Sequence, residues 1–128
     1  MTRYASLRIL GPVLLAACAM TSQARAQAPA TPMNGILVGP NQMTLYVFDK
    51  DAAGSGKSVC NGGCATNWPP LMAAAGDTAS GDWSVITRDD GSKQWAYKGK
   101  PVYLYKSDMK AGDMTGDNFK NVWHVIKP

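Results

Sequence analysis

Two copies of one short pattern lie about half a chain apart in this sequence. In "LYVFDKD", residues 45–51, an aromatic residue follows the tyrosine by two positions and an aspartate follows three positions later. "VYLYKSD", residues 102–108, repeats that spacing at an offset of 103 − 46 = 57 residues. Repeated patterns indicate repeated structural units, and one hairpin-sized unit alone could not bury its own apolar face. We therefore expect two related units that pack against each other.

The sequence around each copy is also shared between the halves. A strand and a tight turn precede each patterned strand, and a Gly-rich loop follows it and leads to Trp68 or Trp123. Between two β-prone runs, "DDG" at residues 89–91 predicts a hairpin. All nine acidic residues are Asp, which disfavours long helices. We expect an all-β fold of mostly antiparallel short strands, with two degenerate hairpin–loop–Trp repeats packed into one small domain.

The amino-terminal residues have the composition of an export signal. Arg3 and Arg8 precede a short apolar run, and Ala24 and Ala26 supply a small-x-small cleavage site before Gln27. The apolar run is too short to span a bilayer. The expected organisation is a signal peptide at 1–26, a flexible Ala/Pro-rich lead-in at 27–34 and a two-repeat β domain at 35–128, with repeat one at about 35–70 and repeat two at about 93–127.

Cys18 offers an alternative to simple cleavage. "LAAC", residues 15–18, resembles the lipobox of bacterial lipoproteins, in which the cysteine is acylated and becomes the new amino terminus. Cleavage after Ala26 predicts a periplasmic or secreted protein, whereas acylation of Cys18 predicts a membrane-anchored lipoprotein. We favour cleavage after Ala26 because the apolar stretch ahead of Cys18 is short. Membrane association is expected only through a lipid anchor on Cys18.

The charge of the mature chain argues against nucleic acid as a partner. Loss of three arginines with the signal leaves 13 − 3 = 10 basic residues against nine Asp, a net charge of about +1. No cluster of Lys and Arg remains to form a basic patch. The expected partner is an envelope ligand or protein that the sequence does not identify.

The doubled pattern has two interpretations. Its aromatic side chains project from one face of each strand, and each aspartate falls just beyond the strand end, where its carboxylate can accept N–H bonds of the turn. In the first interpretation, which we favour, each copy supplies an aromatic layer to a shared core. In the second, two Tyr/Asp clusters line a pseudo-symmetric cleft that binds a ligand. The candidate residues are Tyr46, Phe48, Asp51, Tyr103, Tyr105 and Asp108.

Cys60 and Cys64, in "CNGGC", have neither the spacing of a thioredoxin-like site nor the following His of a c-type haem site. Export to an oxidising compartment favours a disulfide between them. The alternative is a periplasmic copper or thiol-redox protein, because a reduced pair with Met or His ligands would suit copper(I). The methionines form no compact motif, so no metal or other cofactor is expected. The further ligands of that alternative would be Met33, Met43, Met72, Met109, Met114 and His124.

Enzymatic residue patterns are scarce. The chain has no Glu, a single His and no Gly-x-Ser-x-Gly or comparable nucleophile setting. We therefore expect a non-enzymatic binding or structural module of the cell envelope.

Four stretches carry a family resemblance: "LYVFDKD", "CNGGCATNWPPL", "DDGSKQWAYKGKPVYLYKSD" and "GDNFKNVWHV". Together they resemble a family of secreted bacterial repeats described as predicted lipoproteins with a Tyr-x-aromatic-x-x-Asp motif. The resemblance covers about residues 35–127, and the motifs occur in the family's order. It implies export, two repeats and a disulfide-like Cys pair, and it adds weight to lipidation at Cys18. It implies no catalytic residue and no specific biochemical function.

Overall fold

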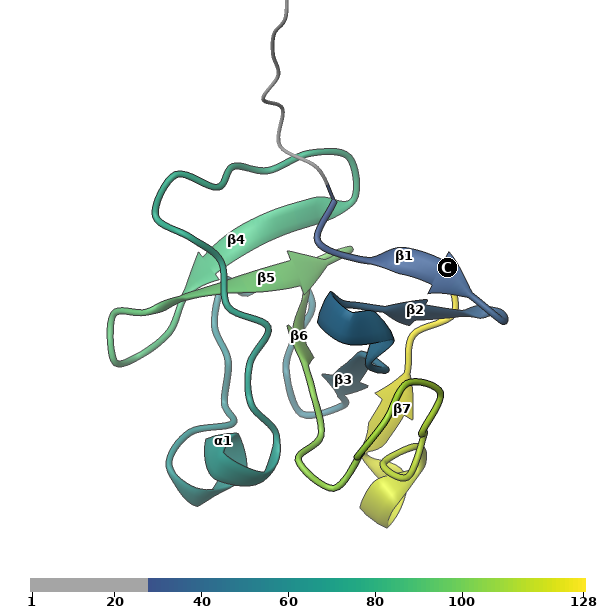
Figure 1. Cartoon of the computed structure of the whole chain (residues 1–128). Helices are drawn as coiled ribbons and strands as arrows, with labels where there is room; N and C mark the ends of the chain where they lie inside the picture. The colour runs from purple at the N-terminus through teal and green to yellow at the C-terminus, as the bar shows by residue number, and fades with distance from the viewer. Residues whose placement is uncertain (1–27) are drawn as a thin grey trace, which may run out of the picture.

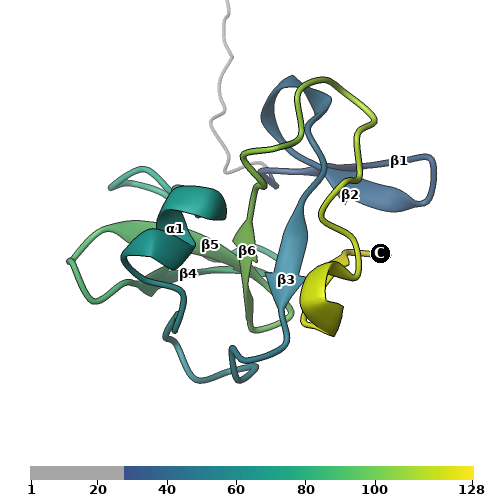
Figure 2. The same ribbon diagram turned by 90° about the horizontal axis from the view of Figure 1, so that it is seen from below.

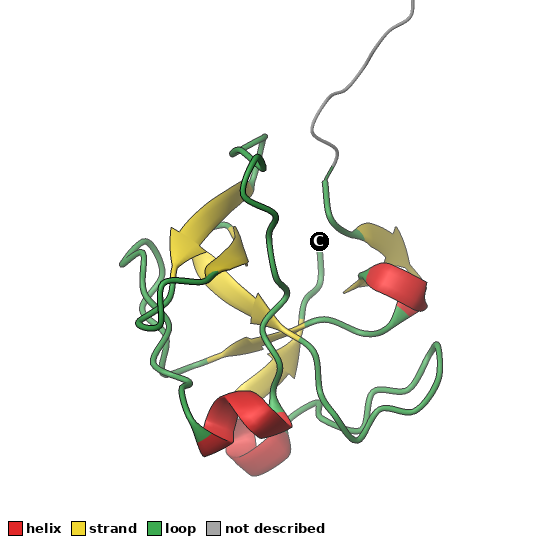
Figure 3. Ribbon diagram, turned by 60° about the vertical axis from the view of Figure 1, so that its left-hand side comes forward, coloured by secondary structure: helices red, strands yellow, loops and turns green. Residues whose placement is uncertain are grey.

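The computed structural model describes residues 28–128, so the expectations for the signal peptide at 1–26 and for Cys18 lie outside the described residues. Strand and loop make up most of this part, and helix is confined to short turns (Figure 3). None of these helices is long and apolar enough to cross a membrane. The strands are β1 Thr31–Met33, β2 Ile36–Val38, β3 Tyr46–Phe48, β4 Trp83–Thr87, β5 Lys93–Tyr97, β6 Lys100–Tyr103 and β7 Trp123–Val125, and the helices are η1 Pro40–Gln42, α1 Gly63–Asn67 and η2 Phe119–Asn121.

The two copies of the pattern begin on β3 and β6, which pair antiparallel inside a five-stranded sheet (Figure 1). The strand order of this sheet is β4-β5-β6-β3-β7. Tyr46 lies directly opposite Tyr103, so equivalent residues of the two halves face each other across the pair. Opposite residues of an antiparallel pair project from the same face of the sheet. The two halves are therefore related by a local two-fold axis that passes between these tyrosines.

The segments next to β3 and β6 follow the same two-fold relation. β7 pairs with the outer side of β3. On the outer side of β6, the first residues pair with β5, and the chain from residue 67 to 71 runs alongside residues 102–106. There the Leu104 N–H donates to the Pro69 carbonyl at 2.7 Å. Pro69 and Pro70 have no N–H of their own, so this equivalent of β7 forms no continuous strand. Figure 2 shows the two loop helices, α1 and η2, on opposite sides of β3 and β6.

A hairpin precedes the central strand in each half. β4 and β5 form the hairpin predicted around "DDG". β1 and β2 form a separate two-stranded sheet, joined at Asn34 and Gly35, whose φ angles are 54° and 85°. Two successive positive φ angles are what a two-residue hairpin turn requires. The prediction of a flexible lead-in at 27–34 is therefore wrong for β1, because the Asn-Gly turn signal overrides the Ala/Pro-rich composition.

The sheet separates two apolar clusters. Strand alternation places Val102 on one face, where it packs in a cluster with Trp83 and Trp95 of the β4–β5 hairpin. Tyr46 and Tyr103 lie on the other face. The second cluster consists of Tyr46, Phe48, Cys60, Trp68, Tyr103 and Trp123, with Tyr105 packed against it. The predicted all-β fold of two packed repeats is confirmed.

Candidate functional site

The doubled tyrosines and aspartates bond across the two halves. The Tyr46 hydroxyl donates to Asp108 Oδ2 at 2.6 Å, and the Tyr103 hydroxyl donates to Asp51 Oδ2 at 2.6 Å. Each tyrosine therefore bonds to the aspartate of the other copy, not to its own. We refer to these contacts as the Asp108 pair and the Asp51 pair.

The second oxygen of each aspartate holds its own loop. Asp51 Oδ1 accepts the Val59 N–H at 2.7 Å, and Asp108 Oδ1 accepts the Thr115 N–H at 2.9 Å. The carboxylates lie beneath the surface, with Asp51 1% and Asp108 6% exposed. Both oxygens of each group are thus occupied by protein donors. A ligand could reach these carboxylates only by displacing the core.

The environment of the pairs keeps both phenols protonated. Burial raises the pKa of Tyr46 and of Tyr103 above the ordinary tyrosine value. The hydrogen bond to the neighbouring carboxylate raises each pKa further, because a phenolate there would lie beside a like charge. The two tyrosines are therefore hydrogen-bond donors and not bases at neutral pH.

The remaining aromatic residues of the two halves form one stack, which we call the aromatic column. The rings of Trp68 and Trp123 lie parallel, with centroids 3.8 Å apart and an interplanar angle of 2°. Phe48 stacks on Trp123 at 4.2 Å, and the equivalent Tyr105 stacks on Trp68 at 4.0 Å. The column thus alternates between the halves in the order Phe48, Trp123, Trp68 and Tyr105.

Arg88 is part of the site, although the doubled pattern does not contain it. Its guanidinium, 5% exposed, donates to Ser58 Oγ at 3.0 Å, to Gln94 Oε1 at 2.7 Å and to the Cys60 carbonyl. Ser58 Oγ lies 2.6 Å from the Tyr103 hydroxyl. Because Tyr103 gives its proton to Asp51, Ser58 is the donor in that contact. The hydroxyls of Ser58 and Tyr103 therefore connect the buried Arg88 guanidinium to the buried Asp51 carboxylate.

One sequence signal points to Arg88. It is the only arginine after residue 25, in a chain that otherwise uses lysine as its cation. A planar guanidinium can satisfy several acceptors at once, which a lysine ammonium does less well in a buried site.

Cys60 and Cys64 are joined by a disulfide, as predicted. The bond closes residues 60–64, which directly follow Ser58 and Val59 of the Asp51 pair. Because both sulfurs are bonded to each other, the copper alternative loses its thiolate ligands. Within residues 28–128, no group of three or more His, Cys or Asp side chains could hold a metal ion. His124 instead contacts Asp49 at 2.8 Å and Asn118 at 3.1 Å.

The methionines of that alternative lie away from the core. Met72, Met109 and Met114 are exposed, and Met33 lines a small cavity of about 100 Å³ together with Met114. None of the five methionines in the described part of the chain is buried.

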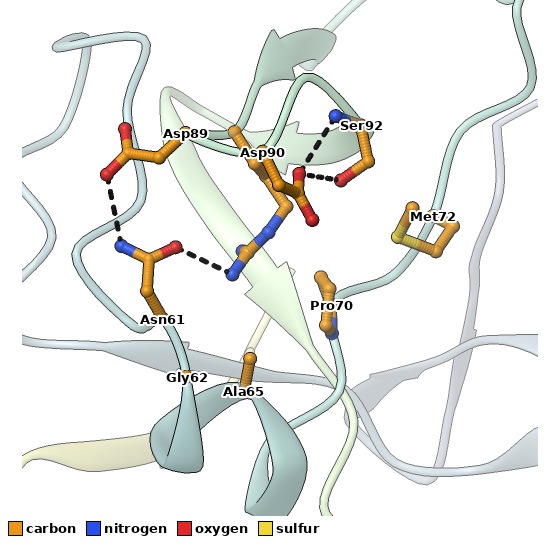
Figure 4. A pocket seen from close by; sticks show the side chains of 9 residues that line it. Asn61, Gly62, Ala65, Pro70, Met72, Asp89, Asp90 and Ser92 are labelled. Carbon is orange, nitrogen blue, oxygen red and sulfur yellow. Dashed lines mark hydrogen bonds between the residues drawn. The ribbon is translucent and has the colours of Figure 1, made fainter.

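A hollow of about 520 Å³ opens beside the disulfide loop, and we call it the 61–92 hollow (Figure 4). Asp89 and Asp90 lie on one side of it, and Ala65, Pro70 and Met72 lie on another. Asn61 donates to Asp89 at 3.3 Å and accepts from Arg88 at 3.2 Å. The full lining is Asn61, Gly62, Ala65, Pro70, Met72, Arg88, Asp89, Asp90 and Ser92.

Comparison with family models gives two matches in this chain, at residues 30–72 and 84–127. The matching family is described as a secreted repeat of unknown function. The chain belongs to this family. Searches of curated proteins and of solved structures found no match.

The family match agrees with the internal symmetry. Each matched repeat contains a hairpin, a patterned strand, a loop and a tryptophan segment, which is the unit seen on both sides of the two-fold axis. The repeats begin earlier than the residues 35 and 93 expected from the sequence, because β1 belongs to the first repeat and the β4–β5 hairpin to the second. The resemblance in the sequence is thereby confirmed.

Proposed function

We propose that the protein is a non-enzymatic binding module of the cell envelope, which receives its ligand in the 61–92 hollow. The observation that carries this proposal is the burial of the doubled motif. The carboxylates and phenols of the two pairs are occupied by each other, so their role is to build a rigid domain. Ligand recognition then falls to surface groups outside the motif.

The hollow has the size and lining of a small-ligand site. Its volume of about 520 Å³ falls within the range of roughly 300–1,000 Å³ that is usual for such sites. Asp89 uses Oδ2 for Asn61, and Asp90 uses Oδ1 for Ser92, so each carboxylate keeps a second oxygen without a partner among the described residues. The hydrogen bonds from Ser92 lower the pKa of Asp90, which keeps that carboxylate charged. Two anionic groups beside Pro70 and Met72 suit a cationic group on an apolar stem.

The wall behind these groups is rigid. The disulfide fixes the loop that carries Asn61, and Arg88 bonds to both Asn61 and the Cys60 carbonyl. A preformed wall lowers the entropic cost of binding, because fewer side chains must be ordered when the ligand arrives.

A titration followed by amide NMR tests this proposal with two matched probes, n-hexylamine and n-hexanol. We expect the amine to shift the amides of Asn61, Asp89 and Ser92, and the alcohol to shift them much less. The double variant Asp89→Asn/Asp90→Asn should lose the preference for the amine. The matched control is Asp82→Asn, an exposed aspartate outside the hollow, which should keep that preference. Equal shifts with both probes, or shifts elsewhere on the surface, would contradict the proposal.

Export in soluble form is part of the same proposal. The basic head, short apolar run and small-x-small site favour cleavage after Ala26 and release of a chain that begins at Gln27. The intact mass of the protein from the producing cell measures this directly. A mass that corresponds to a diacylated or triacylated Cys18 would place the domain on a membrane, with the residues between Cys18 and β1 as its tether.

A further inference from the structure

The two Tyr–Asp pairs lie against the aromatic column. The Tyr46 ring contacts Trp68 edge-on, with ring centroids 5.3 Å apart. The Tyr103 ring contacts Trp123 in the same way, with centroids 5.0 Å apart. Trp68 and Trp123 are themselves in parallel contact at 3.8 Å. The four rings therefore form a continuous contact path, and each end of the path is a phenol that is hydrogen-bonded to a carboxylate.

This arrangement has the chemistry of proton-coupled electron transfer. Loss of one electron makes a phenol strongly acidic, so its oxidation is easiest where a base can take the proton at once. Asp108 and Asp51 accept from the phenols at 2.6 Å, which places such a base in contact with each oxygen. Parallel indole rings in contact can share a positive hole, which favours its passage between them.

We propose that the aromatic column and its Tyr–Asp pairs act as a one-electron relay that stores an oxidising equivalent as a neutral tyrosyl radical. The oxidant is a one-electron oxidant at the protein surface, such as an oxygen-derived radical. It meets the column at Tyr105, which is only partly buried and stacks directly on Trp68. This role goes beyond the proposed ligand binding and does not depend on it.

The storage step balances in charge and atoms. An electron moves from the Tyr46 phenol to the oxidised Trp68 ring, and the phenol proton moves to Asp108. The products are a neutral tyrosyl radical, a neutral indole and a neutral carboxylic acid, formed from one cation and one anion. Loss of separated charges is favourable in a buried, low-dielectric site. A phenol or thiol reductant supplies the electron that restores Tyr46, and the proton returns from Asp108.

The surroundings favour the Asp108 pair over the Asp51 pair as the storage site. Arg88 is joined to Tyr103 through Ser58, and its positive charge makes proton transfer to Asp51 less favourable. From the residues that the structure describes, the Tyr46 hydroxyl instead accepts only the uncharged Gly116 N–H, at 3.2 Å. The radical is therefore expected on Tyr46.

The protein contains its own control cluster. Trp83, Trp95 and Tyr97 also pack together, with Trp83 and Tyr97 centroids 4.9 Å apart. Tyr97 has no hydrogen bond to a carboxylate within residues 28–128. A relay that requires a proton acceptor will bypass this cluster, whereas nonspecific oxidation will not.

Flash photolysis with a ruthenium tris-bipyridine photo-oxidant, followed by electron paramagnetic resonance of the frozen full-length mature protein, tests the relay. We expect a tyrosyl signal in the wild type, which narrows when the protein carries ring-deuterated tyrosine. Tyr46→Phe should lose the long-lived signal, and Tyr97→Phe should keep it. Asp108→Asn, which keeps an acceptor oxygen but accepts a proton poorly, should shorten the radical lifetime. Each variant is compared at equal folded fraction by circular dichroism.

The wild-type measurement needs no substitution, so a negative result overturns the proposal even if a variant fails to fold. A signal that stays on tryptophan, or the absence of any tyrosyl signal from the folded wild type, would overturn the proposal. So would a tyrosyl signal that survives Tyr46→Phe and disappears in Tyr97→Phe.

Discussion

The Asp51 pair and the Asp108 pair are the same contact in two different settings. The loop behind the Asp51 pair carries the Cys60–Cys64 disulfide, and Arg88 contacts it from the β4–β5 hairpin. The loop behind the Asp108 pair has neither feature among the described residues. It lies on the other side of the central strands, where it ends in η2 (Figure 2).

The second loop gains its support from close packing. A side chain at Gly116 would place its Cβ 2.6 Å from Trp68 and 2.9 Å from Tyr105, so only glycine allows the backbone to approach the aromatic column this closely. Thr115 adds a hydroxyl donor to Asp108 Oδ1 at 2.6 Å. One half therefore fixes its loop with a covalent bond and a buried cation, and the other fixes an equivalent loop with glycine against the rings.

The largest expected difference between the halves concerns the ends of the aromatic column. Phe48 is 8% exposed and Tyr105 is only partly buried. Phe48→Ala should lower the free energy of unfolding by ~3–5 kcal/mol through cavity formation. Tyr105→Ala should lower the free energy of unfolding clearly less, because solvent already covers part of the Tyr105 ring. Urea unfolding of both variants measures the difference, and equal losses would contradict it.

Removal of the Arg88 cation should affect the loop behind the Asp51 pair more than the loop behind the Asp108 pair. Arg88→Met removes the guanidinium donor from three buried acceptors, on Ser58, Cys60 and Gln94. We expect the free energy of unfolding to fall by ~3 kcal/mol or more, because each buried acceptor that loses a donor costs ~1–3 kcal/mol. Lys57→Met, an exposed control, should stay close to wild type. Unfolding curves that coincide for Arg88→Met and wild type would show that the buried chain of hydroxyls needs no cation.

Removal of one phenol hydroxyl probes each pair by itself. Tyr103→Phe and Tyr46→Phe should each cost ~1.5–3 kcal/mol, because each removes a hydrogen bond to a charged group. Tyr103→Phe should be the more costly change, since it also leaves Ser58 without its acceptor beside Arg88. Thermal unfolding of the two variants measures their stabilities. A larger loss of stability in Tyr46→Phe than in Tyr103→Phe would contradict this prediction.

The disulfide should contribute about as much as one phenol hydroxyl. Cys60→Ala/Cys64→Ala opens a very short loop, which corresponds to ~2 kcal/mol in the chain-entropy treatment. Amide hydrogen exchange should rise in residues 55–64 and change little in the second loop. Equal increases in both loops would show that the halves are not supported separately.

High pH should weaken both pairs while leaving neutral-pH stability intact. Burial raises the pKa of Tyr46 and Tyr103 in the folded state, so their contribution is complete below the unfolded tyrosine pKa of about 10 and is lost as the pH rises through the folded values. Stability should therefore fall above about pH 10. Each Tyr→Phe variant should show a shallower fall than the wild type. A parallel pH dependence in the variants would assign the loss to other groups.

Local sequence determined much of the fold. The doubled pattern and its two-residue alternation predicted two β units with an aromatic face, because strand geometry alone decides which side chains share a face. Asp-Asp-Gly predicted the β4–β5 hairpin, and export predicted the Cys60–Cys64 disulfide. The β1 strand was within reach of the same reasoning, since Asn34-Gly35 is a strong hairpin signal.

The partners of the buried groups depend on tertiary structure. Tyr46 bonds to Asp108 and not to Asp51 because β3 and β6 pair with the two tyrosines opposite each other. That register joins residues 62 positions apart and is fixed by packing on both faces of the sheet. The burial of Arg88 and the stacking of Trp68 on Trp123 likewise appear only when both halves are assembled. Spacing along one strand fixes the direction of a side chain, whereas its contacts are decided by the chain that folds against it.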